Sequence, residues 1–175
     1  TQSFGKGEWD IGFGTRTPSV ADKAEFVVDV VLTDYVFVAA SGREFADASQ
    51  VDRPGVRIAV GKNSSSDQFL SRTLKSAELV RTPAGSSTSE ALRSGKADVY
   101  AASASNVQQT IGSIPGAKLV PGAFTSDRYM VTLPKGKSSA AQSKIAEIVR
   151  EAKKSGVVTK AIEQLGLKGV RAAPD

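Results

Sequence analysis

The sequence contains no cysteine and no histidine. Their absence excludes thiol nucleophiles, histidine general bases and the usual zinc ligands, so any catalysis would depend on carboxylates, lysines or hydroxyl groups. A chain without disulfides is compatible with an oxidising compartment, although it does not indicate one by itself. We therefore expect neither a metal ion nor a cofactor.

Long apolar runs are also lacking, and no segment reaches the length of a membrane span or has the pattern of a signal peptide. The 23 basic and 18 acidic residues give a net charge of +5, but the basic residues are scattered and form no arginine-rich run. This pattern is typical of a soluble basic surface and argues against a nucleic-acid partner. With 175 residues, 40% of them hydrophobic, the chain can build one domain or two small lobes.

Apolar segments of strand type alternate with segments of helical periodicity along most of the chain. This alternation predicts an α/β fold with mostly parallel sheets, in which residues 56–120 form a sheet of their own. A further helix is expected to begin at Thr17-Pro18-Ser19. The expected strands are 9–14, 35–40, 56–60, 78–81, 98–102, 118–120 and 129–133, and the expected helices are 47–51, 67–74, 87–93, 106–111, 140–154 and 157–165.

The stretch GKNSSSDQFL, residues 61–70, places three serines between a predicted strand and a predicted helix. One interpretation is helix capping, because a serine hydroxyl accepts a hydrogen bond from the first amides of a helix and Asp67 suits the positive end of its dipole. The other interpretation is a ligand cradle, because free amides and small donors at a helix start bind carboxylates or other anions. Both interpretations can hold at once.

Five stretches, in order, resemble the extracellular solute-binding proteins of polar amino-acid ABC transporters, which have the two-lobe type II periplasmic-binding fold. GEWDIGFGTRTPSVADKAEF (7–26) is similar to the family's strand, threonine-rich turn and Thr-Pro helix start, and YVFVAASG (35–42) to its first hinge strand. The other three are VDRPGVRIAVGKNSSSDQFL (51–70), EALRSGKADVYAAS (90–103) and FTSDRYMVTLPKG (124–136).

The resemblance implies that residues 41–127 form lobe 2, and that residues 1–40 and 128–175 form a first lobe lacking its N-terminal part. A fragment, a processed product or a second polypeptide would each explain the lack. We expect the apolar side chains of Ile11, Phe13 and the run Val27–Val31 to be exposed and covered by another chain, either a second copy or a different partner.

The same resemblance implies a ligand between the lobes, contacted by Gly14, Thr15, Arg16, Asn63, Ser64, Ser65 and Ser103. Two positions depart from the family's pattern: its carboxylate-clamping Arg falls on Val20, and its ammonium-binding Asp falls on Ser103. Neither side chain supplies the charge that the family uses. Arg16 either replaces the clamp or is a solvated surface arginine, and an ordinary α-amino acid is not the expected ligand.

The resulting hypothesis is a periplasmic or membrane-associated extracellular protein that captures a small polar or anionic solute and delivers it to an ABC-transporter permease. Hinge closure around the solute is the expected mechanism. The alternatives are a ligand-sensing input domain of the same fold and an enzyme similar to cyclohexadienyl dehydratases. The enzyme would need a carboxylate acid and a carboxylate-binding arginine, and Val20 and Ser103 provide neither.

Overall fold

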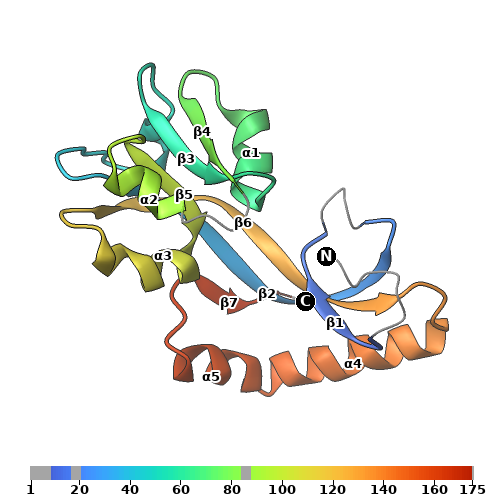
Figure 1. Cartoon of the computed structure of the whole chain (residues 1–175). Coiled ribbons are helices and arrows are strands. Elements are labelled where there is room, and N and C mark those ends of the chain that lie inside the picture. Colours follow the sequence, from blue (N-terminus) through green and yellow to red (C-terminus); the bar gives the residue numbers. More distant parts are fainter. Residues whose placement is uncertain (1–8, 17–20, 84–87, 175) are drawn as a thin grey trace. The chain divides into compact units, whose positions relative to one another are not determined.

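The computed structural model describes residues 9–16, 21–83 and 88–174 (Figure 1). The strands are β1 (Gly12–Gly14), β2 (Ala24–Ala39), β3 (Arg57–Gly61), β4 (Glu78–Thr82), β5 (Val99–Ser103), β6 (Lys118–Pro134) and β7 (Val170–Ala172). The α-helices are α1 (Ser65–Thr73), α2 (Thr88–Arg93), α3 (Ala104–Thr110), α4 (Ser139–Lys154) and α5 (Val157–Gln164), and two short 3₁₀ helices are η1 (Ala48–Val51) and η2 (Ile111–Ser113).

Most predicted elements are confirmed to within a few residues, and two strands are longer than predicted. β2 joins the run Val27–Val31 to the predicted strand 35–40, and β6 joins 118–120 to 129–133. The short strand β7 was not predicted. The predicted helix start at Thr17-Pro18-Ser19 lies outside the described residues, while residues 21–23 form a turn that leads directly into β2.

The strand pairing is mixed rather than mostly parallel. β3 pairs in parallel with β4 and β5, whereas β5 is antiparallel to β2, β1 to β6, and β7 to β2. The strands follow one hydrogen-bonded path, β1-β6-β2-β5-β3-β4, with β7 on β2. The expectation of a separate sheet for residues 56–120 was therefore wrong, because the long strands β2 and β6 connect the pairings.

The chain divides into two compact units, residues 1–33 with 127–175, and residues 34–126. The chain passes from one unit to the other within β2 and again within β6. The lobe bounds expected from the resemblance, 41–127 and the remainder, stay a prediction.

In the unit of residues 34–126, successive side chains along a strand point to opposite faces of the sheet and enter two different hydrophobic clusters. On β5, Val99 and Ala101 belong to the cluster that contains Leu70 of α1, and Tyr100 and Ala102 belong to the cluster that contains Leu92 of α2. The central strands of this unit are therefore covered on both faces, which explains their nearly continuous apolar sequences.

In the unit of residues 1–33 and 127–175, helix α4 packs on the long strands through a smaller cluster. Val28 of β2, Val131 of β6 and Ala146 of α4 are buried together, and Val27 and Val30 pack against them. The expectation that the whole run Val27–Val31 is orphaned was therefore wrong, because α4 covers part of it. In the described part of the chain, no helix is long and apolar enough to cross a membrane.

Two exposed apolar residues that the sequence indicated lie at β1 of the same unit: Phe13 within the strand and Ile11 directly before it. Ile11 is 54% and Phe13 is 69% exposed. Phe13 pairs with Val131, which is only 2% exposed. The two side chains lie on the same face of the sheet, and this face is buried at β6 but exposed at β1. The expected exposure of Ile11 and Phe13 is confirmed, and their coverage by another chain stays a prediction.

Candidate functional site

The turn between β3 and α1 is built from a left-handed residue and a serine cap. Asn63 has φ of +63°, a conformation that asparagine tolerates better than most residues. The N–H of Ser64 donates to the carbonyl of Gly61 at 3.0 Å. Ser64 is the N-cap of α1, and its Oγ accepts a hydrogen bond from the N–H of Asp67 at 3.1 Å. The predicted capping role is confirmed for this serine.

Asp67 completes a reciprocal capping arrangement beneath the turn. Its Oδ2 accepts from the N–H of Asn63 at 2.9 Å, and its Oδ1 accepts from Arg81 Nε at 2.8 Å and Ser71 Oγ at 3.1 Å. Burial raises the pKa of this carboxyl group, but the bonds from Asn63, Arg81 and Ser71 outweigh it, so the pKa lies below its usual value. Asp67 therefore stays ionised and is neutralised by Arg81.

These contacts define what the turn can still offer to a ligand. The N–H of Asn63 is already bound, whereas the hydroxyl hydrogen of Ser64 remains able to donate because its oxygen acts as the acceptor in the cap. Ser65 is the first residue of α1, and the first amides of a helix have no acceptor within the helix. Capping and ligand binding are thus chemically compatible at this turn.

Ser103 lies at the same edge of the strands as this turn. It is the last residue of β5 and the N-cap of α3, where its Oγ accepts a long hydrogen bond of 3.4 Å from the N–H of Asn106. The parallel register pairs Ile58 with Val99, and extending it brings Ser103 opposite Lys62. The structure therefore brings together four of the predicted residues, Asn63, Ser64, Ser65 and Ser103.

Two threonines at this edge were not singled out from the sequence. Thr82 ends β4 opposite Gly61, and its Oγ1 lies 2.9 Å from Oγ1 of Thr88 at the start of α2. The N–H of Lys62 donates to the carbonyl of Thr82 at 2.9 Å. The signal was available in principle, because the strand 78–81 was predicted in the same mostly parallel sheet as the strand 56–60, and the C-terminal ends of parallel strands meet at one edge.

The other three predicted residues lie at the end of β1 in the other unit, where Gly14 is the last residue of the strand and Thr15 and Arg16 follow it. Gly14 pairs with Met130, Thr15 is half-buried, and Arg16 is exposed. The guanidinium carbon of Arg16 lies 5.8 Å from the centroid of the Phe26 ring, a weak cation–π contact. Val20, where the resemblance would require an arginine, lies outside the described residues.

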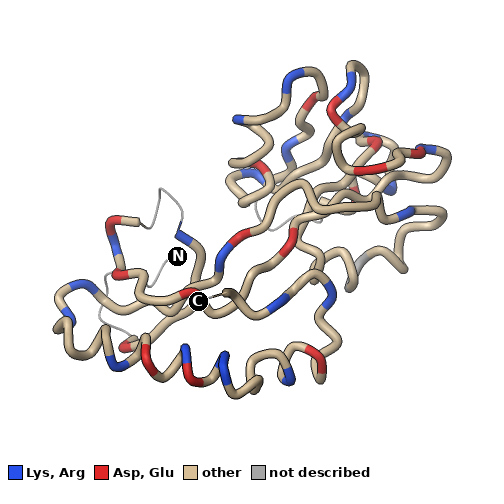
Figure 2. The backbone as a smooth tube through the Cα atoms, turned by 180° about the vertical axis from the view of Figure 1, so that it is seen from behind, with Lys and Arg blue, Asp and Glu red and all other residues tan. Residues whose placement is uncertain are grey.

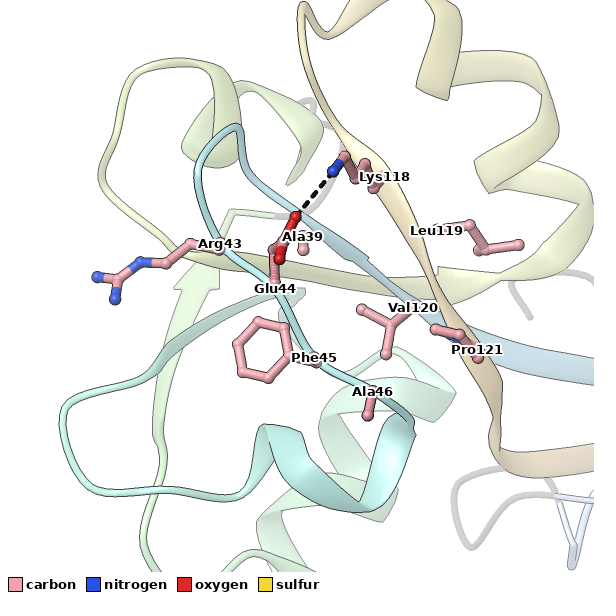
Figure 3. A pocket seen from close by; sticks show the side chains of 9 residues that line it. All are labelled: Ala39, Arg43, Glu44, Phe45, Ala46, Lys118, Leu119, Val120 and Pro121. Carbon is pink, nitrogen blue, oxygen red and sulfur yellow. Dashed lines mark hydrogen bonds and ion pairs between the residues drawn. The ribbon is translucent and has the colours of Figure 1, made fainter.

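A groove of about 410 Å³ lies on the unit of residues 34–126, away from this edge (Figure 3). Lys118 Nζ donates to Glu44 Oε1 at 3.0 Å and lowers the pKa of that carboxyl group. Ala39, which helps to line the groove, pairs with Val99 at the start of β5, whereas Ser103 ends that strand. The groove therefore belongs to the opposite end of β5 from the serines.

Basic and acidic residues are interspersed along the backbone (Figure 2). Several form exposed ion pairs, such as Lys144 with Glu147 and Arg93 with Glu90. This distribution agrees with the scattered charge of the sequence.

The sequence matches no protein-family model and no curated protein. Its structure matches a solute receptor for L-cysteine of Neisseria gonorrhoeae with a TM-score of 0.71 and 17% identity, covering 96% of this chain and 69% of that one. A putative binding component of an ABC transporter from Wolinella succinogenes, complexed with lysine, matches with a TM-score of 0.75 and 16% identity over 93% and 72% of the two chains.

A third match is an ancestral amino acid-binding protein described as a precursor of cyclohexadienyl dehydratase. Its TM-score is 0.71 and its identity 18%, over 93% of this chain and 71% of that one. At such identities the likeness shows the fold, and function has to be argued from the site. The chain has the type II periplasmic-binding-protein fold.

Proposed function

We propose that the protein is a solute-binding protein that captures a small polar or anionic solute between two lobes and delivers it to the permease of an ABC transporter. The observation that carries the proposal is the likeness to solute receptors over more than nine-tenths of the chain. A periplasmic, or extracellular and membrane-associated, location follows from this role.

The proposed ligand contacts are Gly14, Thr15 and Arg16 on one lobe, and Asn63, Ser64, Ser65 and Ser103 on the other. On the second lobe, Ser64 and Ser103 combine capping with free hydroxyl hydrogens, and Ser65 contributes the start of α1. Small donors at the carboxyl ends of parallel strands are placed where open α/β sheets bind ligands.

Hinge closure is the proposed mechanism, because β2 and β6 each contribute residues to both compact units. The lobes exchange between open and closed arrangements, and a solute that contacts both lobes favours the closed one by its differential affinity. A sensing domain of the same fold would share this binding step and differ in its output.

An enzyme of the dehydratase type is the alternative suggested by one structural neighbour. Such chemistry needs an available acid, and Asp67 is engaged by Arg81, Ser71 and a backbone amide. The loops 61–66, 82–88 and 103–106 contain no Asp or Glu. We therefore infer binding without turnover.

The test is to denature the purified full-length protein, identify the released small molecules by mass spectrometry, and return each to fresh protein in a thermal-shift assay. We expect one solute to raise the melting temperature saturably, because binding to the folded state alone stabilises it. Recovery of the same molecule unchanged after incubation supports binding, whereas its conversion to a product supports the enzyme. The proposal is contradicted if no solute is released and no small polar or anionic compound shifts the melting temperature.

A further inference from the structure

The net positive charge of the chain is concentrated in its C-terminal segment. Residues 135–175 contain nine of the 23 basic residues and four of the 18 acidic residues, which leaves fourteen of each in the rest of the chain. The whole net charge of +5 therefore belongs to this segment. From Lys144 to Arg171, a stretch that includes α5 and most of α4, seven basic residues occur with three acidic ones. The two helices follow one another along one side of their unit (Figure 1).

Helix stability accounts for only part of this charge. Lys153 and Lys154 lie in the last turn of α4, where cations interact favourably with the helix dipole. Lys160 completes the first turn of α5 and Glu163 lies in its last turn, so both charges oppose the dipole of that helix. Residues that break a local rule of this kind are often placed for function.

Three of the basic side chains on these helices are available to a partner. Arg150, Lys154 and Lys160 are exposed, and no ion pair in the described part of the chain includes them. Glu147, in contrast, is already paired with Lys144. An anionic surface placed against the helices would therefore gain interactions with cations that are not neutralised by a carboxylate of this chain.

Exposed apolar side chains lie beside these cations. Val157, the first residue of α5, is 54% exposed, and Lys160 is its neighbour on the helix surface three residues further on. Ile148 of α4 is 54% exposed and Leu165, directly after α5, is 71% exposed. Lysines and arginines that accompany exposed apolar side chains on a helix are typical of segments that lie at the surface of an anionic bilayer. An acidic protein would use the cations alone and leave the apolar exposure unexplained.

We propose that the surface formed by Ile148, Arg150, Lys154, Val157 and Lys160 binds peripherally to an anionic lipid bilayer. The cations contact the headgroups, and the apolar side chains enter the boundary between headgroups and acyl chains. The inference goes beyond the proposed function and does not depend on which solute is bound. A protein held at the bilayer in this way meets a membrane permease at a higher effective concentration.

The test is flotation of the full-length protein with vesicles of phosphatidylcholine alone, and with vesicles of phosphatidylcholine and phosphatidylglycerol in equal parts. We expect partitioning to the anionic vesicles to be at least about tenfold stronger, and to fall as added salt screens the charges. Partitioning that is equal for the two kinds of vesicle, or absent from both, would overturn the proposal.

Charge variants locate the contact. Lys154→Gln/Lys160→Gln should weaken partitioning to the anionic vesicles by about tenfold or more, because each basic residue near the bilayer adds to the attraction. Lys75→Gln/Lys96→Gln is the matched control, since it removes the same charge from exposed residues of the other unit, and it should change partitioning much less. Equal losses in the two variants would show that only the total charge matters, and would overturn the assignment to α4 and α5.

Apolar variants distinguish a bilayer from an acidic protein, for which poly-L-glutamate serves as the probe. Ile148→Ser/Val157→Ser should weaken partitioning to the anionic vesicles by several fold and leave binding to poly-L-glutamate unchanged. Vesicle binding that is unchanged in this variant would mean that the apolar side chains take no part. Binding to poly-L-glutamate without binding to vesicles would identify an acidic protein as the partner. Either result would overturn the proposal.

The absence of cysteine from the chain permits a direct measurement of insertion. Val157→Cys and the control Lys96→Cys, each labelled with an environment-sensitive fluorophore, are mixed with the anionic vesicles. We expect emission to shift to shorter wavelength for the label at position 157 alone, because only that label enters the bilayer interface. A shift for the control label, or for neither, would contradict the proposed orientation.

Discussion

Asp98 illustrates at the scale of single residues how the unit of residues 34–126 is stabilised. The carboxylate is 4% exposed and accepts from the N–H, Nε and Nη2 of Arg57, each at 3.0 Å, and from Arg43 Nη2 at 2.8 Å. The hydrogen bonds from the Arg57 side chain are the main cause that lowers the pKa of Asp98 from 3.8 to about 2, against the opposing effect of burial. The charged form therefore stabilises the fold.

The pH dependence follows from the sign of this shift. A pKa that is lower in the folded state means that the unfolded chain binds the proton more readily, so the stabilisation is complete above about pH 4 and lost as the pH falls through about 2. Asp98→Asn should lower the free energy of unfolding by about 2 kcal/mol at neutral pH. Urea denaturation should show the difference from the parent protein narrowing below about pH 4.

The exposed pair of Glu90 and Arg93 provides the control. Glu90→Gln should change the free energy of unfolding by less than about 0.5 kcal/mol, because exposed ion pairs are screened by water. Equal losses in the two variants, or a loss for Asp98→Asn that does not vary with pH, would contradict the role given to Asp98.

The buried hydroxyl group of Thr132 lies close to Gly12, its partner on β1. Its Oγ1 has no hydrogen-bond partner in the described structure, and a Cβ added to Gly12 would lie 2.8 Å from that atom and 3.2 Å from the Trp9 ring. Gly12→Ala should therefore lower the free energy of unfolding by about 1–3 kcal/mol through overpacking. Gly112→Ala, where the added carbon has no neighbour within 4 Å, should be nearly neutral. Comparable denaturation midpoints for the two variants would contradict this packing.

At the scale of elements, the sequence predicted the α/β alternation but not the continuity of the two long strands. Thr33-Asp34 in β2 and Ser126-Asp127-Arg128 in β6 read as polar interruptions of apolar runs. In the structure these polar residues make contacts: Ser126 Oγ lies 2.5 Å from Asp34 Oδ1, and Arg128 pairs with Asp29. Such contacts join distant parts of the chain and leave no local signal. Periodicity alone therefore began the first of these strands too late and divided the second into two.

Asp52 fixes the connection between α1 and β4 through three hydrogen bonds to its backbone. It is the C-cap of η1, and its carboxylate accepts from the backbone N–H groups of Lys75, Ser76 and Ala77 at 2.8–2.9 Å. Asp52→Ala should lower the free energy of unfolding by about 1–3 kcal/mol and speed hydrogen exchange of these three amides, because they lose their acceptor.

Asp47 is a suitable control because it caps only η1, through Ser49. Asp47→Ala should leave hydrogen exchange at residues 75–77 unchanged. Exchange of those three amides that stays slow in the Asp52→Ala variant would show that another group accepts their hydrogen bonds, and would contradict the role given to Asp52.

At the scale of the whole molecule, the exposed apolar residues at the start of β1 bear on assembly. We predict that Ile11 and Phe13, 54% and 69% exposed, are covered in solution by a second copy or another chain. The double variant Ile11→Ser/Phe13→Ser should shift sedimentation towards the monomer, whereas Leu165→Ser, at a residue 71% exposed after α5, should not. A parent protein that sediments as a single monomeric species would contradict the prediction.

The candidate site could be predicted only in part. Ser64 and Ser65 were found because hydroxyls between a strand and a helix have a local signature, and Ser103 because the family resemblance places a ligand contact at that position. Thr82 and Thr88 were missed, since their place at the edge depends on the pairing of β4 with β3. The engagement of Asp67 by Arg81 likewise depends on side chains from different elements and has no signature in the sequence.

The central claim is that the serine-rich edge binds the solute, and calorimetric titration of the identified solute into the Ser64→Ala/Ser65→Ala variant tests it most directly. Ser138→Ala is the matched control, because Ser138 caps α4 by accepting from the N–H of Ala141 at 3.2 Å and lies in the other unit. We expect the double variant to lose about 1–3 kcal/mol of binding free energy, and the control to lose about 1 kcal/mol of stability with its affinity unchanged. A double variant that loses stability but binds the solute as tightly as the parent would show that these serines only cap α1, and would contradict the claim.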